Sequence, residues 1–194
     1  GERDVTIRFS PPPQQQSAQT NKPVSKIESR LLSDSIAYIS ILGMTGTVVD
    51  DFINAFNQLG SAPFLIIDVR RNQGGNSGNS EKITEHLIKK DLRACVFVLT
   101  SHYTFSAAVS FVLDLLESGS ATLIGMPTGG DTGHQPKFYT SKLGYSYWFP
   151  TRKHVQVSEQ GFPMEGQSIE PHYLVKRTVE DYLKGEDTVL NYTL

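Results

Sequence analysis

The chain has 194 residues, a length typical of a single domain. Its composition, with 38% hydrophobic and 20% charged residues, is typical of folded globular proteins and excludes the disordered and collagen-like classes. A net charge of -2 without long charged blocks argues against nucleic-acid binding, and no apolar run is long enough to span a membrane.

The N-terminal residues differ in character from the rest of the chain. Alternating apolar residues within positions 1–10 predict one short strand. Residues 11–23 are rich in Pro, Gln, Ser and Thr, a composition that predicts a mobile linker. We therefore expect residues 1–23 to belong to a larger upstream region and residues 24–194 to form the main domain.

From residue 35 onward, strand patterns alternate with helix patterns. Apolar runs predict strands, and the amphipathic stretches between them predict helices. In chain order they are a strand at 35–42, a helix at 48–59, a strand at 64–69, a helix at 80–90, a strand at 94–100, a helix at 104–117 and a strand at 121–126. This order implies right-handed crossovers and a mainly parallel sheet with helices on its faces. Alternating aromatic residues at 138–157 predict an antiparallel ribbon, and residues 178–184 a terminal helix.

Paired glycines, Gly74 and Gly75, follow the predicted strand 64–69. Glycines allow a sharp turn and a close approach of backbone N–H groups to a ligand, as in an anion nest or an oxyanion hole. The alternative is an ordinary turn between a strand and a helix. The run lacks the endings of a P-loop and of a dinucleotide site, which disfavours phosphate cofactors.

A serine, Ser106, lies where the predicted strand 94–100 gives way to a helix. The positive end of a helix dipole favours the negative charge of a nucleophile under attack. The alternative is that Thr104 or Ser106 only caps the helix. Consecutive parallel strands would bring this turn and the glycine pair to the same sheet edge. A serine beside backbone donors is the minimum arrangement for acyl transfer.

Three runs in this order, LIIDVRRNQGGN, FVLTSHYTFSAAVSFVLDLL and ATLIGMPTGG, resemble the S41 serine peptidases, the tail-specific and C-terminal processing proteases. The resemblance implies an α/β fold of the crotonase-like (ClpP/crotonase) type, with a twisted, mainly parallel sheet flanked by helices. It implies that Ser106 is the nucleophile of a serine-type endopeptidase. The oxyanion hole would then use the N–H of Gly74 or Gly75 with that of Ala107. No cofactor is implied.

The group that activates the serine differs between branches of this family. One branch uses a lysine in the segment that here reads Gly129–Gly133, which holds no lysine; Lys137 is the nearest. The other branch, with the tricorn core and the retinoid-binding proteins, uses a histidine and a glutamate. Residues 164–171 resemble its glutamate segment, so that Glu165 would orient the base. The alternative for Glu165 is a solvated loop carboxylate.

In that second branch the base histidine comes from a segment upstream of the sheet. We therefore expect the base outside this stretch of chain, which alone would be impaired. Two internal histidines are the alternatives: His102, four residues before Ser106, and His134, after a glycine-rich loop. The other histidines, His86, His154 and His172, are predicted to be structural or exposed.

Further predictions concern metals, partners and location. No cysteine pair or histidine–carboxylate cluster has the spacing of a metal site, and Cys95 lies in an apolar run typical of a buried strand. The expected partner is a polypeptide substrate. By family resemblance the site of action is periplasmic or extracellular, although no signal peptide is visible.

Two other functions compete with the peptidase interpretation. One is a non-catalytic binding module of the same fold for apolar ligands or peptides, as in retinoid-binding relatives. The other is an acyl-CoA hydratase, which would need a glutamate beside the oxyanion hole and a basic patch for the CoA phosphates; neither is evident in the sequence.

Overall fold

The computed structural model describes residues 25–194 apart from residues 61, 91–95, 131–133, 141–145 and 153–165. Within residues 131–165, only the backbone of two strands is described. The predictions made above for residues 1–23, Cys95, His154 and Glu165 therefore lie outside the described residues.

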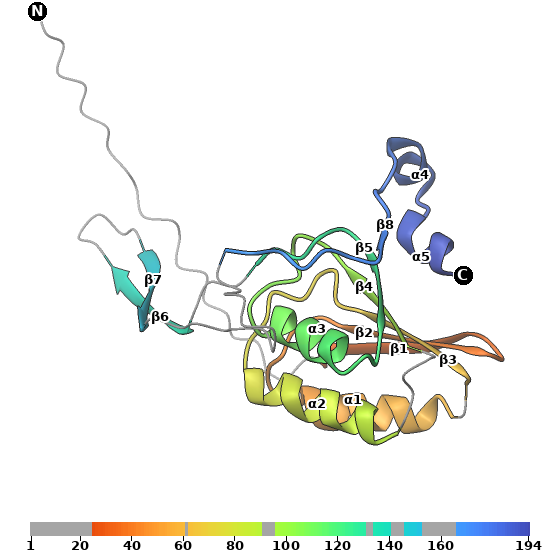
Figure 1. Cartoon of the computed structure of the whole chain (residues 1–194), viewed down its shortest axis with the longest axis horizontal. Coiled ribbons are helices and arrows are strands. Elements are labelled where there is room, and N and C mark those ends of the chain that lie inside the picture. The colour runs from red at the N-terminus through yellow and green to blue at the C-terminus, as the bar shows by residue number, and fades with distance from the viewer. Residues whose placement is uncertain (1–24, 61, 91–95, 131–133, 141–145, 153–165) are drawn as a thin grey trace, which may run out of the picture.

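A six-stranded sheet forms the centre of the molecule, in the order β1-β2-β3-β4-β5-β8 (Figure 1). The first two strands are antiparallel, and every later neighbour pairs in parallel. The strands are β1 (Ile27–Ser33), β2 (Ile36–Ile41), β3 (Phe64–Asp68), β4 (Val96–Thr100), β5 (Thr122–Gly125) and β8 (Tyr173–Leu174). The prediction of a mainly parallel sheet is confirmed.

Three helices lie on one face of this sheet, and α2 packs between the other two (Figure 1). They are α1 (Val48–Gln58), α2 (Ser77–Lys89) and α3 (Ala107–Glu117). Helix α2 begins three residues before the predicted start, because the Asn76 side chain accepts a hydrogen bond from the Gly78 N–H and caps it there. Helix α3 begins three residues later than predicted, since Thr104–Ser106 belong to a turn.

The core lies mainly between the sheet and the three helices. Inward-facing residues such as Ile39, Ile67 and Val98 pack there against Val48 and Phe52 of α1 and the apolar face of α3. A second, smaller cluster lies on the opposite face of the sheet. It comprises Tyr38, Ile66, Leu99, Ile124, Val175 and Val189. Burial on both faces explains why the central strands read as continuous apolar runs.

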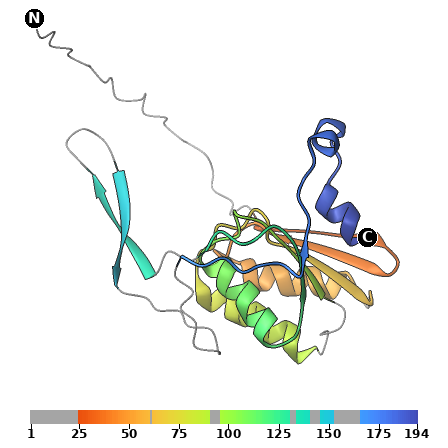
Figure 2. The same cartoon turned by 45° about the horizontal axis from the view of Figure 1, so that its top comes forward.

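The C-terminal segment covers part of the second face. Helix α5 (Thr188–Thr193) contacts β4 and β5, whereas α4 (Val179–Lys184) projects away from the sheet (Figure 2). The sequence predicted α4, but β1, β8 and α5 were not predicted.

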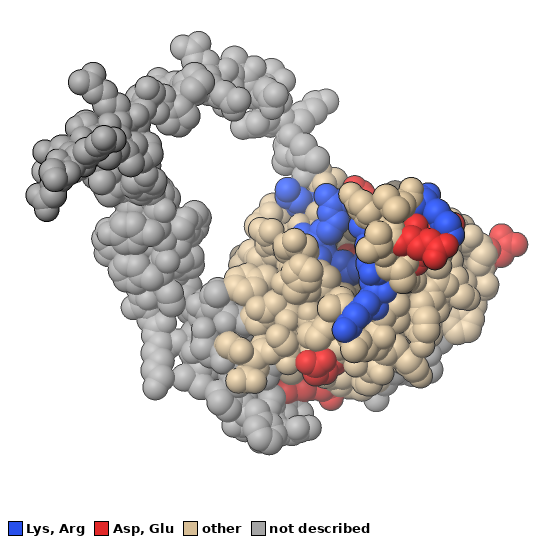
Figure 3. All heavy atoms as spheres, turned by 90° about the horizontal axis from the view of Figure 1, so that it is seen from above, with Lys and Arg blue, Asp and Glu red and all other residues tan. Residues whose placement is uncertain are grey.

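The predicted ribbon is present as β6 (His134–Thr140) and β7 (Ser146–Arg152), an antiparallel pair that extends away from the sheet (Figure 2). The face seen in Figure 3 carries positive and negative side chains side by side. Among the described helices, none combines the length and apolar character needed to cross a membrane.

Candidate active site

Two turns meet at the carboxyl edge of the sheet, one after β3 and one after β4. Hydrogen bonds join the two turns directly, so each fixes the position of the other. These bonds run from Ser101 Oγ to the Arg70 carbonyl (2.6 Å), from Thr104 Oγ1 to the Val69 carbonyl (2.9 Å) and from the Phe105 N–H to the Asn72 carbonyl (3.0 Å). The sequence argument that parallel strands would bring these turns to one edge therefore holds for their backbones.

Ser106 has an unusual backbone conformation, with φ 54° and ψ -126°. Among the described residues it is the only non-glycine residue with a positive φ. A side chain in this region is strained, and such strain persists only where the surrounding structure enforces it. The Ser106 side chain makes no capping hydrogen bond to α3. A strained serine on a sharp turn between a strand and a helix is the geometry of a nucleophile elbow.

Thr104, the other candidate cap, has a different role. Its side chain is fully buried, and its hydroxyl accepts a hydrogen bond from the Ser101 N–H (3.0 Å) while donating to the Val69 carbonyl. Thr104 therefore holds the turn after β4 rather than capping the helix.

Gly74 lies directly against the serine turn. Its φ is 94°, and a Cβ added to it would lie 2.7 Å from Ser106 Cβ and 2.9 Å from the Ala107 nitrogen. Only glycine fits this position. The Gly74 N–H donates to Asn72 Oδ1 (2.9 Å).

Gly75 forms a parallel bridge with Met44. The Met44 N–H donates to the Gly74 carbonyl (2.9 Å), and the Asn76 N–H donates to the Met44 carbonyl (2.8 Å). This pattern leaves the Gly75 N–H directed away from Met44. Within the described part of the chain, neither the Gly75 N–H nor the Ala107 N–H has a hydrogen-bond partner. The Ala107 N–H is free because it lies in the first turn of α3.

A second glycine pair, Gly129 and Gly130, borders the serine turn. The Gly129 N–H donates to the Thr104 carbonyl (2.9 Å), and a Cβ on Gly129 would meet the His102 carbonyl and, at 3.2 Å, the Phe105 ring. A Cβ on Gly130 would lie 3.2 Å from the Gln167 carbonyl. The glycine pair therefore lies between the serine turn and the segment that directly follows residue 165.

The described structure does not place a histidine on Ser106. His102 is exposed, and its ring lies 4.1 Å from the Tyr103 ring. His134 begins β6, and its side chain is not among those described. His172 Nδ1 accepts a hydrogen bond from the Leu123 N–H (2.9 Å) and has a structural role, as the sequence predicted. The structure thus gathers the proposed nucleophile and backbone donors, and no described side chain hydrogen-bonds to Ser106.

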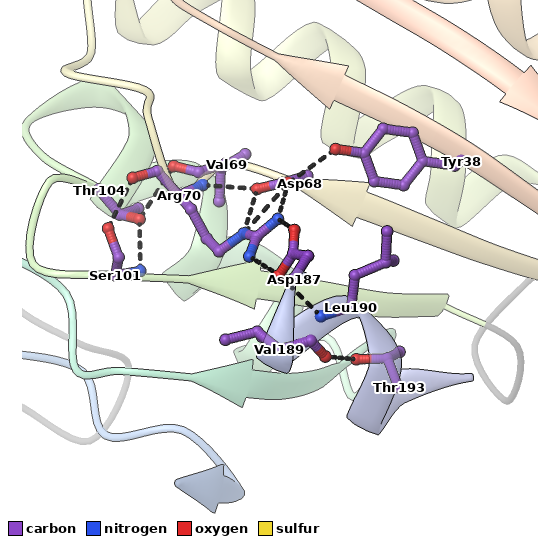
Figure 4. A network of polar contacts seen from close by, with 10 residues as sticks. All are labelled: Tyr38, Asp68, Val69, Arg70, Ser101, Thr104, Asp187, Val189, Leu190 and Thr193. Carbon is purple, nitrogen blue, oxygen red and sulfur yellow. Dashed lines mark hydrogen bonds and ion pairs between the residues drawn. The ribbon is translucent and has the colours of Figure 1, made fainter. Parts of the chain in front are cut away.

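A network of charged side chains supports the turn after β3, and sequence reasoning missed it (Figure 4). Arg70 donates two parallel hydrogen bonds of 2.6 Å to the Asp187 carboxylate and three more, of 2.6–3.1 Å, to the buried Asp68. The Tyr38 hydroxyl donates to Asp68 (2.7 Å). The spacing of Asp68 and Arg70 could have predicted an ion pair between these two residues. Asp187 lies 117 residues from Arg70, and no sequence pattern links the two positions.

The network shifts the pKa values of Tyr38 and Arg70 upward. Burial and the neighbouring Asp68 raise the pKa of Tyr38 to about 12. Burial alone would lower the pKa of Arg70, but the hydrogen bonds to Asp187 and Asp68 raise it overall. Neither Tyr38 nor Arg70 can act as an acid or base near pH 7, so we assign the network a structural role. Among the described residues, no group of three side chains could hold a metal ion.

Comparisons with known proteins concern the family and the fold of the chain. The model of peptidase family S41 matches residues 35–96 and 89–175 of the chain. The tricorn protease of Thermoplasma acidophilum is 27% identical over 187 residues, which cover 82% of this chain and 16% of that protein. The crystal structure of the tricorn protease superposes with a TM-score of 0.68 at 26% identity, over 82% of this chain and 17% of that one.

Two further solved structures share the fold at lower identity. A protein from Parabacteroides merdae has a TM-score of 0.68 at 22% identity, over 91% of this chain and 65% of its own. The photosystem II D1 C-terminal processing protease has a TM-score of 0.65 at 15% identity, over 79% of this chain and 49% of its own. The chain therefore spans less than two thirds of these relatives. With most of its length matched by the family model, the chain belongs to peptidase family S41.

Proposed function

We propose that residues 24–194 form the catalytic domain of a serine endopeptidase whose nucleophile is Ser106. The observation that carries this proposal is the conformation of Ser106: a strained serine at a helix N-terminus, packed against Gly74. The N–H groups of the two neighbouring residues Gly75 and Ala107 have no hydrogen-bond partner among the described residues. Membership of peptidase family S41 supports the same reaction.

In the first step Ser106 Oγ attacks the carbonyl carbon of the peptide bond, and its proton passes to a general base. The carbonyl oxygen becomes an oxyanion, which accepts hydrogen bonds from the Gly75 and Ala107 N–H groups. Of the two glycines we assign Gly75, because the Gly74 N–H already donates to Asn72. Each such donor contributes on the order of a 100- to 1,000-fold rate increase.

In the second step the tetrahedral intermediate collapses and the amine leaves with the proton that the base had taken. Water then attacks the acyl-enzyme, the base takes a proton from this water, and Ser106 Oγ recovers its proton as the acid product leaves. Positioned backbone donors serve both tetrahedral intermediates.

For the general base we assign a histidine upstream of the described sheet, oriented by Glu165. The resemblance of residues 164–171 to the glutamate segment of the tricorn branch supports this assignment. His102 and His134 are the internal alternatives. The substrate is a polypeptide, and the site of action that the family suggests is periplasmic or extracellular.

The test is cleavage of casein and of a fluorogenic peptide by the full-length protein that contains this chain. Ser106→Ala should reduce kcat/KM by at least about 1,000-fold, since only the oxyanion donors and substrate binding remain. Ser33→Ala, an exposed serine on β1, is the matched control and should cleave like the wild type. Cleavage by Ser106→Ala at the wild-type rate would contradict the proposal. Equal inertness of both proteins would instead favour the binding module.

A further inference from the structure

We propose that Asn72 is a positioning residue of the oxyanion hole, which directs the Gly75 N–H into the site; this inference rests on the proposed function. Asn72 is fully buried, so its side chain cannot itself contact the substrate. Asn72 would act indirectly, by holding Gly74 and Gly75 in position.

Asn72 connects the two turns that build the site. Its N–H donates to the Val69 carbonyl (3.0 Å), and its carbonyl accepts from the N–H of Phe105 (3.0 Å), the residue before Ser106. Its side-chain oxygen accepts from the Gly74 N–H (2.9 Å). One residue therefore bonds to both the nucleophile turn and the glycine turn.

These bonds determine where the next N–H points. The Gly75 N–H belongs to the same planar peptide unit as the Gly74 carbonyl, and in a trans peptide the two groups point in opposite directions. Met44 holds that carbonyl from one side, while Asn72 holds the Gly74 N–H and with it the positive φ of 94°. If the Asn72 side chain were removed, Gly74 could rotate and the Gly75 N–H would lose its direction.

The side-chain nitrogen of Asn72 supports a role beyond stability. It is buried, and no partner for it exists among the described residues. An unsatisfied buried donor is unfavourable for folding, so an asparagine here needs another explanation. Asparagine offers an acceptor to the Gly74 N–H without the negative charge that aspartate would place near a developing oxyanion.

The test uses the full-length protein and normalises kcat to active sites titrated with a fluorophosphonate. Asn72→Ala should lower kcat by about 10- to 100-fold with KM changed less than about threefold, because a misdirected donor weakens only the transition state. The inhibition constant of a peptide aldehyde, which forms a hemiacetal with Ser106 and places its oxygen in the hole, should weaken by the same factor. The inhibition constant of a product peptide should not change.

Two further variants separate positioning from stability. Phe52→Leu, on the buried face of α1 that packs in the core, should lower the melting temperature without changing kcat or the inhibition constant of the aldehyde. Asn72→Asp keeps the shape and the acceptor for the Gly74 N–H, so the turn should form, and the acidic group beside the hole should lower kcat at least about 10-fold. This second variant decides the matter if Asn72→Ala does not fold.

The positioning role of Asn72 would be overturned if the Asn72 variants had the wild-type kcat per titrated site, or if only their KM changed. The proposed function would stand in either case. If the wild type and Ser106→Ala both fail to cleave, the proposed function fails, and the role of Asn72 fails with it. The two failures are therefore distinguishable.

Discussion

At the scale of single residues, the site depends on backbone positions that accept no side chain. Gly74 is the clearest case, because a Cβ there would lie 2.7 Å from both the Phe105 carbonyl oxygen and Ser106 Cβ. Contacts this short cannot be accommodated by a flexible side chain, since the neighbouring atoms belong to the fixed turn around the nucleophile. Any substituent at Gly74 must therefore move Ser106.

Gly74→Ala should reduce cleavage by at least about 100-fold, because a shift of about an ångström at the nucleophile carries a loss of this size. Gly60→Ala is the matched control: Gly60 also has a positive φ, 72°, but a Cβ there would meet nothing within 4 Å. It should lose only about 1 kcal/mol from backbone strain and keep wild-type cleavage. The rate at which a fluorophosphonate labels Ser106 measures the reactivity of the serine in both variants. Labelling of Gly74→Ala at the wild-type rate would show that a side chain at position 74 does not displace Ser106.

The sequence pointed to the glycine pair and Ser106 as candidates, because residue type and position after a strand carry that information locally. It could not predict the positive φ of Ser106 or the use of the Gly74 N–H by Asn72. Both follow from the meeting of two turns more than 30 residues apart in the chain, a distance shown by the bond from Thr104 to Val69. Glu165, His102 and His134 stay predictions, because no described contact joins any of them to Ser106.

At the scale of elements, α3 carries an ionisable group in an unfavourable place. Asp114 lies partly buried on this helix, and burial together with Glu81 of α2 and Glu117 raises its pKa from 3.8 to about 6. The folded state therefore binds the proton more tightly than the unfolded state does. The contribution of Asp114 to the free energy of unfolding is therefore greatest below about pH 4, and it is lost as the pH rises through 6.

Asp114→Asn removes this cost and should raise the free energy of unfolding at pH 8 by about 1 kcal/mol, a value reduced for the partial solvent screening of the site. At pH 4 the variant and the wild type should unfold alike, since Asp114 is then protonated in the folded protein. Urea unfolding at the two pH values measures the difference. Ser33→Ala, exposed on β1, removes no ionisable group and should unfold like the wild type at both pH values, and an equal gain of Asp114→Asn at both pH values would argue against the mechanism.

The central strands and the three large helices were predictable, because buried strands and amphipathic helices have clear periods. Strand β1 escaped prediction since its residues are mostly exposed and show no strong apolar alternation. Helix α5 is six residues long, and its position depends on a distant ion pair instead of its own pattern. A contact between residues so far apart cannot be predicted from the local sequence pattern.

At the scale of the whole molecule, the Arg70–Asp187 pair joins the last helix to the centre of the sheet. The bidentate bond reaches from the turn after β3 to the N-cap of α5, whose Asp187 side chain also accepts from the Leu190 N–H (3.1 Å). Burial opposes ionisation of Asp187, but the bonds from Arg70 and from backbone N–H groups hold its pKa below the usual value. The pair therefore contributes stability above the unfolded pKa, which is lost as the pH falls through the folded one.

Asp187→Asn should release the C-terminal segment at neutral pH, because asparagine can still cap α5 but cannot neutralise Arg70. We expect a loss of about 1 kcal/mol, hence a melting temperature lower by roughly 2–4 °C, and faster proteolysis within residues 178–194. Lys184→Gln is the control in the same segment, since it breaks an exposed pair with Glu180 and leaves the Arg70–Asp187 pair intact, and it should change neither measurement. Unchanged proteolysis of Asp187→Asn would show that apolar contacts of α5 suffice. A lower rate of substrate cleavage by Asp187→Asn would show in addition that α5 supports the active site through Arg70. The Arg70 carbonyl accepts a hydrogen bond from the Ser101 hydroxyl, in the turn that carries Ser106.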